Sequence, residues 1–133
     1  MRREKINIRQ LRIQKDILRL LSQIIFKEIR DVRVEKAGCI INDVILSPDI
    51  TSARIYIAFV ERDLTDNDQK EVLRILNDAE GFLRSKLAKS IKMKSIPRLH
   101  FYYDDFLDEV IKMEESLEEE RIELENLQKN IEE

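Results

Sequence analysis

Residues 63–94 have the apolar periodicity of a helix, and one of the chain's two glycines lies in the middle of this stretch. Glycine inside a helix costs roughly 0.5–1 kcal/mol relative to alanine, so its presence calls for a reason. The apolar stripe continues on both sides of Gly81 and comprises Val72, Leu76, Ala79, Leu83 and Leu87. Because the stripe continues, we predict a kink at Ala79, Glu80 and Gly81 that joins two helices.

The segments around this helical stretch predict a small β-sheet. Residues 39–47 are rich in Ile and Val, and in residues 53–60 successive side chains are expected to point to opposite faces of a strand. Pro48 and Asp49 lie between the two segments and predict the turn of a hairpin. Pro97 ends the helical stretch, and residues 99–104 predict a third strand.

The first segment of the chain predicts another amphipathic helix. Its apolar residues recur at steps of three and four: Ile13, Ile17, Leu20, Leu21, Ile24 and Ile29. We expect this helix to fade between Asp31 and Gly38, where the pattern becomes irregular and ends in a turn former. The predicted order is α-β-β-α-(kink)-α-β, a two-layer α+β domain over residues 1–105 with its helices on one face of a three-stranded sheet.

Residues 106–133 form a separate acidic extension. Residues 103–133 carry 13 acidic and 3 basic side chains. Six of its apolar residues fit the a and d positions of a coiled-coil heptad: Val110, Met113, Leu117, Leu124, Leu127 and Ile131. Glu120 occupies one of these positions and interrupts the pattern. Two alternatives stay open, an amphipathic helix or short coiled coil, and a partly disordered tail whose like charges repel one another.

The rest of the chain is basic, although the net charge of the whole is −3. Residues 1–102 carry 21 basic and 14 acidic side chains. One cluster lies in the first segment (Arg2, Arg3, Lys5, Arg9 and Arg12) and another follows the predicted kink (Arg84, Lys86, Lys89, Lys92, Lys94 and Arg98). This asymmetry predicts a nucleic-acid-binding domain whose basic side chains hold phosphates without reading sequence. The alternative is that the lysines are a solvated face and that Gly81 only allows tight packing.

The chain lacks the residue patterns of common enzymes. Its single histidine, His100, and single cysteine, Cys39, both fall in predicted strands, where we expect them to pack. One histidine and one cysteine are too few for the common zinc-binding motifs. The chain's two glycines, at 38 and 81, are too few and too far apart for a P-loop or a dinucleotide-binding motif. We therefore expect no catalysis, no metal and no cofactor. The absence of a long apolar run and the lone cysteine favour a cytoplasmic protein over a membrane protein.

The predicted order resembles a type II KH domain, an RNA-binding fold. KH domains carry a GxxG loop that clamps the RNA backbone, but the glycines here are 43 positions apart. One KH-like family, ribosome-binding factor A, replaces that loop with a helix–kink–helix marked by Ala-x-Gly, and Ala79, Glu80 and Gly81 match it. The resemblance covers roughly residues 2–105 and includes "INIRQLRIQKDILRLLSQII", "NDVILSPDITSARIYIAFV" and "IPRLHFYYDD".

The resemblance implies a bacterial cytoplasmic factor that binds the small (30S) ribosomal subunit during assembly. Such a factor would help ribosomal RNA mature, with particular importance in the cold, and we expect a monomer off the ribosome. The alternative function is a protein-interaction adaptor that dimerises through a C-terminal coiled coil. A dimer formed through the tail would favour the adaptor. Co-sedimentation of a tail-less monomer with small subunits would favour the assembly factor.

Overall fold

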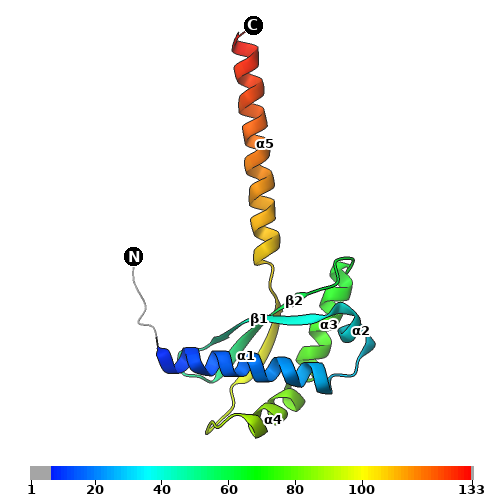
Figure 1. Ribbon diagram of the computed structural model, residues 1–133, viewed down its shortest axis with the longest axis vertical. Coiled ribbons are helices and arrows are strands. Elements are labelled where there is room, and N and C mark those ends of the chain that lie inside the picture. Colours follow the sequence, from blue (N-terminus) through cyan, green and yellow to red (C-terminus); the bar gives the residue numbers. More distant parts are fainter. Residues whose placement is uncertain (1–6, 133) are drawn as a thin grey trace. The chain divides into compact units, whose positions relative to one another are not determined.

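The computed structural model describes residues 7–132 (Figure 1). The chain divides into two units, and the boundary along the chain falls between Tyr103 and Asp104. The first unit is an α+β domain with seven elements: α1 (Ile8–Glu28), α2 (Val32–Ala37), β1 (Cys39–Leu46), β2 (Ser52–Phe59), α3 (Asp66–Asp78), α4 (Glu80–Ser90) and β3 (Arg98–Tyr103). The second unit contains α5 (Phe106–Glu132). Among the described residues, no helix combines the length and apolarity needed to cross a membrane.

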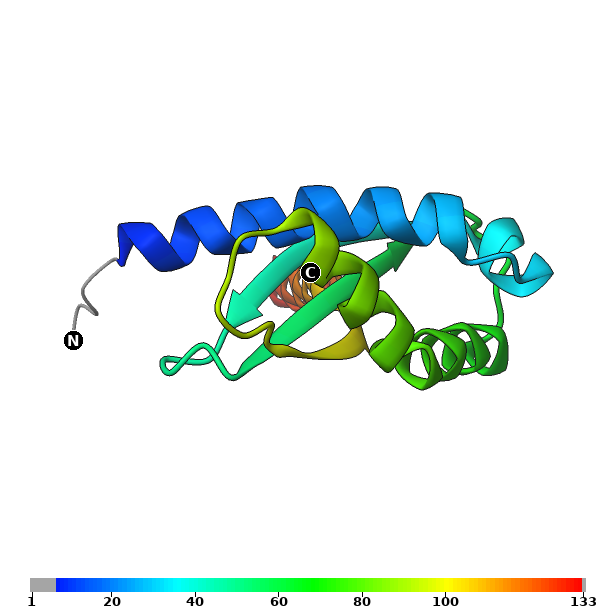
Figure 2. The ribbon, with the colours of Figure 1, turned by 90° about the horizontal axis from the view of Figure 1, so that it is seen from below.

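The three strands form one mixed sheet in the order β1-β2-β3. β1 and β2 are antiparallel, whereas β2 and β3 are parallel. Parallel neighbours need a crossover connection, which α3 and α4 supply. α1 packs on β1 while α3 and α4 pack on β3, and Figure 2 shows α1 and α4 lying over the same side of the strands. The domain is therefore KH-like, with its helices on one face of the sheet, as predicted.

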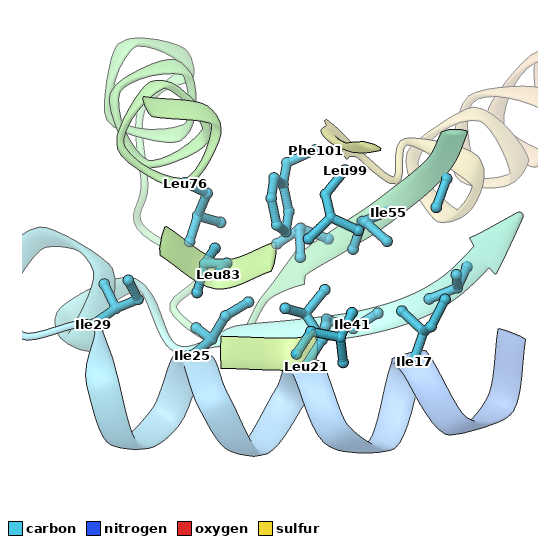
Figure 3. Close-up of a cluster of buried hydrophobic side chains, with 14 of the residues drawn as sticks. Ile17, Leu21, Ile25, Ile29, Ile41, Ile55, Leu76, Leu83, Leu99 and Phe101 are labelled. Atoms are coloured by element: carbon cyan, nitrogen blue, oxygen red, sulfur yellow. The ribbon is translucent and has the colours of Figure 1, made fainter. Parts of the chain in front are cut away.

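The core lies between the sheet and these helices (Figure 3). The apolar stripes predicted for α1 and for α3–α4 supply fully buried side chains, among them Ile17, Leu21, Leu76, Leu83 and Leu87. β2 alternates as predicted, with its buried residues on the helical side and the residues between them more exposed. Burying each such aliphatic side chain contributes roughly 1.5–3 kcal/mol, so these stripes are the main source of the domain's stability.

A bulge in β1 changes which of its residues face the core. The pairing with β2 shifts between Ile41 and Asp43. In a regular strand, Ile41 and Val44 would point to opposite faces, because side chains alternate with a period of two. The extra residue resets the alternation, and both side chains are buried, at 7% and 1% exposure.

α2 was not predicted, because residues 31–38 were expected to be irregular. Asp31 caps the helix by accepting a hydrogen bond from the amide of Arg33. Gly38 ends it with φ of 66°, in the left-handed region that glycine adopts without strain. A Cβ on Gly38 would also lie 3.0 Å from the Cβ of Val60. This glycine is thus required by both its conformation and its packing.

Cys39 and His100 were both expected to pack inside the domain, but only Cys39 does. Cys39 is half-buried, and burial raises the pKa of its thiol to about 11, so the thiol stays protonated at neutral pH. His100 is exposed on the face of the sheet that the helices do not cover. The expectation that His100 packs in the core was wrong, because its place in β3 puts it on the outward side of the alternation.

α5 is one continuous helix of 27 residues. On its surface, Arg121 forms ion pairs with Glu118 and Glu125, at the three- and four-residue spacings that stabilise isolated helices. Several large apolar side chains along α5 are exposed: Met113, Leu117, Ile122, Leu124 and Leu127.

Candidate nucleic-acid interface

A groove of about 760 Å³ opens where four parts of the domain meet. These parts are the first half of α1, the β1–β2 turn, α4 with the loop that follows it, and the start of β3. Five of the basic residues predicted from the sequence line this groove: Arg9, Arg84, Lys92, Lys94 and Arg98. Residues that are up to 89 positions apart in the chain therefore form one positively charged surface.

α1 is fixed against the β1–β2 turn by two glutamines. Asn7 caps the helix by accepting a hydrogen bond from the amide of Gln10. The side chain of Gln10 donates to the carbonyl of Pro48 at 2.9 Å, and the side chain of Gln14 accepts from the amide of Leu46 at 3.0 Å. These bonds hold the first turns of α1, and with them Arg9, beside the groove.

The β1–β2 turn is held by its own polar side chains. Asp49 accepts hydrogen bonds from the hydroxyls of Ser47 and Thr51, both at 2.8 Å, and these bonds lower the pKa of its carboxyl. Ile50 has φ of 60°, which is rare for a β-branched residue. Its amide donates to the carbonyl of Ser47 at 2.9 Å. Ile50 lines the groove together with four other apolar residues, Ile13, Ile91, Met93 and Ile96.

Most of the groove's positive charge is not used within the domain. Among residues 7–132, the side chains of Arg9, Lys92, Lys94 and Arg98 form no ion pair with a carboxylate. Arg84 lies 3.5 Å from Glu80, and its side chain is about one-third exposed. Asp16 and Asp49 are the acidic residues in the lining. Four cations therefore remain available to an external polyanion.

The remaining predicted basic residues do not line this groove. The ammonium of Lys86 lies 3.8 Å from Glu28 and 5.6 Å from the ring centre of Phe82. Lys89 and Arg12 are exposed but lie outside the lining. Arg2, Arg3 and Lys5 lie outside the described residues.

The kink is centred on Ala79, which separates α3 from α4. Its φ of −86° and ψ of 6° depart from helical values, yet its amide still bonds to Ile75 and its carbonyl still accepts from Leu83 at 2.9 Å. A Cβ added to Gly81 would meet nothing within 4 Å. Gly81 is therefore not required by packing in the free protein, and the hypothesis that it allows close packing on the sheet is wrong.

Two side chains beside the kink, Asn77 and Glu80, cover the free edge of β3. Glu80 was predicted only as part of the kink, and Asn77 was not predicted at all. Asn77 accepts from the amide of Phe101 at 2.9 Å and donates to the carbonyl of the same residue at 3.1 Å. Glu80 accepts from the amide of Leu99 at 3.1 Å. They replace a neighbouring strand and so protect the edge from pairing with another chain. The kink makes this possible, because it lets residues from both helices reach one strand.

Replacing Asn77 by Ala is expected to lower the free energy of unfolding by about 1–2 kcal/mol. The change leaves the amide and carbonyl of Phe101 without partners at a part-buried edge. Urea denaturation measures the effect, with Asn67→Ala, at an exposed position on α3, as the control. Equal stability of the Asn77→Ala variant and the wild type would show that water replaces these bonds without loss.

The sequence matches the family model of ribosome-binding factor A over residues 9–117. The chain belongs to the ribosome-binding factor A family. It is 43% identical to ribosome-binding factor A of Stutzerimonas stutzeri over 97 residues, which cover 72% of this chain and 73% of that relative. It is 35% identical to the protein of Syntrophomonas wolfei over 111 residues, which cover 84% and 88%.

Solved structures of ribosome-binding factor A have the same fold. The NMR structure of the Thermotoga maritima protein matches with a TM-score of 0.62 at 30% identity, over 75% of this chain and 91% of that one. A homology model of the Thermus thermophilus factor, fitted into a cryo-EM map of a complex with the 30S subunit, matches with a TM-score of 0.55. Its identity is 25%, over 68% of this chain and 90% of that one.

Proposed function

We propose that this chain is a non-enzymatic assembly factor that binds the small ribosomal subunit and its ribosomal RNA. The observation that carries the proposal is the groove, where the side chains of Arg9, Lys92, Lys94 and Arg98 form no ion pair within residues 7–132. The membership in the family and the 30S complex of the Thermus thermophilus relative support it. No group of His, Cys, Asp and Glu suited to a metal ion occurs among the described residues.

In this proposal, the basic side chains of the groove bind the phosphates of the RNA. Contacts between Lys or Arg and phosphates position a protein on RNA without reading base sequence. Specificity then comes from RNA shape, because the groove and the kink favour one conformation of the ribosomal RNA over another. The equilibrium between the two conformations then shifts toward the one bound more tightly, by at most the difference between the two binding free energies.

The proposal extends to maturation of ribosomal RNA in the cytoplasm and to growth in the cold. Competing RNA structures are more stable at low temperature, so binding energy that favours the conformation present during assembly has its largest effect there. Sedimentation of the protein with mature and immature small subunits tests the proposal. Preferential binding to immature subunits is expected. Absence from both fractions would contradict the proposal.

The alternative is an adaptor that dimerises through α5, and the exposed apolar side chains of that helix favour it. A chain that ends at residue 105 separates the two functions. If the assembly-factor function is right, the shortened chain still sediments with small subunits. If dimerisation through α5 carries the function, the shortened chain loses its partners.

Replacing Gly81 by Ala is expected to raise the free energy of unfolding by about 0.5–1 kcal/mol while weakening binding to small subunits. The stability gain follows because the new methyl meets no atom and alanine favours the helix. The binding loss follows if RNA backbone approaches this exposed glycine closely.

Ala88→Gly, at an exposed position in the same helix, is the matched control for the Gly81 variant. It should lower stability and leave binding unchanged. A stabilised Gly81→Ala variant that binds small subunits as the wild type does would show that RNA does not approach the kink at this glycine.

A further inference from the structure

The face of the sheet opposite the helices carries aromatic and basic side chains that the groove does not account for. Tyr56 of β2 is paired with Tyr102 of β3, and Arg54 is paired with His100 in the same register. All four point away from the buried face, because they alternate with the core residues of β2 and β3. Together they form a platform, which we define as Arg54, Tyr56, His100 and Tyr102.

The platform has the geometry of a stacking surface. The ring centroids of Tyr56 and Tyr102 lie 5.9 Å apart, with their planes inclined by 32°. The guanidinium of Arg54 lies 6.0 Å from the ring centre of Tyr56 and donates to its hydroxyl at 3.2 Å. Tyr102 is 45% exposed. Flat side chains therefore lie next to one another on an accessible strand pair.

β3 connects this platform to the groove. Arg98 lines the groove and is also the first outward residue of β3, with His100 and Tyr102 at the next outward positions. Arg98, His100 and Tyr102 border a hollow of about 390 Å³ at the free edge of this strand, and its lining also includes Asn77 and Glu80. A chain that leaves the groove at Arg98 reaches the platform by following β3. Outward residues of a strand recur at about 6.6 Å, twice the rise per residue.

Charge and shape together indicate the ligand. Arg54 and Arg98 supply positive charge. One carboxylate lies nearby, that of Asp43, which is paired with Tyr56 across β1 and β2. Exposed tyrosines and arginine planes are the groups on which unpaired bases stack in proteins that bind single strands. An anionic chain that carries planar groups matches both features, and single-stranded RNA is such a chain.

We propose that this platform stacks unpaired bases of a single RNA strand that runs along β3 from the groove. The inference rests on the proposed function, and it adds a second surface on the other face of the sheet. The groove supplies contacts to phosphates, whereas the platform supplies contacts to bases. The two surfaces therefore respond differently to an RNA chain that lacks bases.

The test compares the wild type with a variant that carries both Tyr56→Leu and Tyr102→Leu. The probes are a short oligouridine and an abasic ribose-phosphate chain of the same length, with binding followed by fluorescence anisotropy. The expected result is a loss of about fivefold or more in affinity for oligouridine, the lower end for one stacked base. Affinity for the abasic chain should not change. Phe26→Leu, at an exposed position on α1, is the matched control.

Each other outcome overturns the proposal. Unchanged affinity for oligouridine would show that the rings do not stack bases. An equal loss on both probes would show that the rings act only through the charges around them. Loss of binding to small subunits with unchanged binding to oligouridine would assign this face to a ribosomal protein instead.

Two further measurements are needed: one of the folding of the double variant, and one of the binding of the wild type to small subunits. Circular dichroism and melting curves establish that the double variant is folded. If it is not, the single variant Tyr102→Leu takes its place, because Tyr102 is the more exposed ring. Failure of the wild type to bind small subunits would contradict the proposed function. Binding of the wild type with no effect of the tyrosines would contradict only the stacking surface.

Discussion

Replacing Arg9, Lys92 and Lys94 together by Gln should lower the affinity for small subunits on the order of a hundredfold at low salt. Each side chain lines the groove and forms no ion pair within residues 7–132. Gln can still donate a hydrogen bond, so each substitution is expected to cost only about 1 kcal/mol, and three such losses give this factor. The slope of log affinity against log salt should also become shallower by about 2, since fewer counterions are released. Filter binding across a salt series measures both quantities.

The control for the groove variant removes the same charge elsewhere. Lys15, Lys27 and Lys36 are exposed and lie outside the groove lining, so they are replaced together by Gln. This variant should retain most of the affinity and a slope close to that of the wild type. If the two triple variants lose affinity equally, binding depends on total charge, and the groove has no special role.

The variant Leu83→Ala should lose about 3–4 kcal/mol of unfolding free energy. Leu83 is fully buried and lies in the first turns of α4, directly after the kink. Truncating such a leucine removes its transfer free energy and leaves a cavity. Domains of this size have a total stability of about 5–15 kcal/mol, so the variant should melt at least roughly 10 °C lower. Thermal denaturation followed by circular dichroism measures the shift.

Phe82, the neighbouring residue on α4, provides the comparison for Leu83. Its side chain is 45% exposed, so Phe82→Ala should cost less than about 1 kcal/mol, as is usual at the surface. Similar losses in the two variants would show that α4 does not pack on the core through Leu83. A large loss for Leu83→Ala alone would support the packing of α4 on the core through Leu83.

The fold was predictable wherever one side of an element is buried. Alternation in residues 53–60 and the stripe through Leu76 and Leu83 identified a strand and the two helices around the kink. α2 was missed because its 6 residues are too few to show periodicity. Its ends did carry a signal, since Asp31 is a helix-capping residue type and Gly38 is a helix-ending one. The spacing of three between Ile41 and Val44 was the only sign of the bulge.

The candidate site was predictable by residue type but not by position. The spacing of basic residues after the kink predicted a cluster of cations, yet Lys86 lies beside Glu28, which is 58 positions away in the chain. Asn77 was overlooked because an exposed asparagine near a helix end has no sequence signal for a bond to a strand edge. Tertiary packing decides both outcomes. Periodicity reports which side of an element is buried, but it does not report which elements meet.

Cross-linking tests the central claim, that the groove holds RNA of the small subunit, most directly. The protein is bound to purified small subunits and irradiated, and the peptides joined to RNA are identified by mass spectrometry. The proposed interface predicts cross-links in the peptides that contain Arg9 and residues 84–98. Cross-links confined to α5, or to α2 and the end of α1 around Lys27, would contradict it.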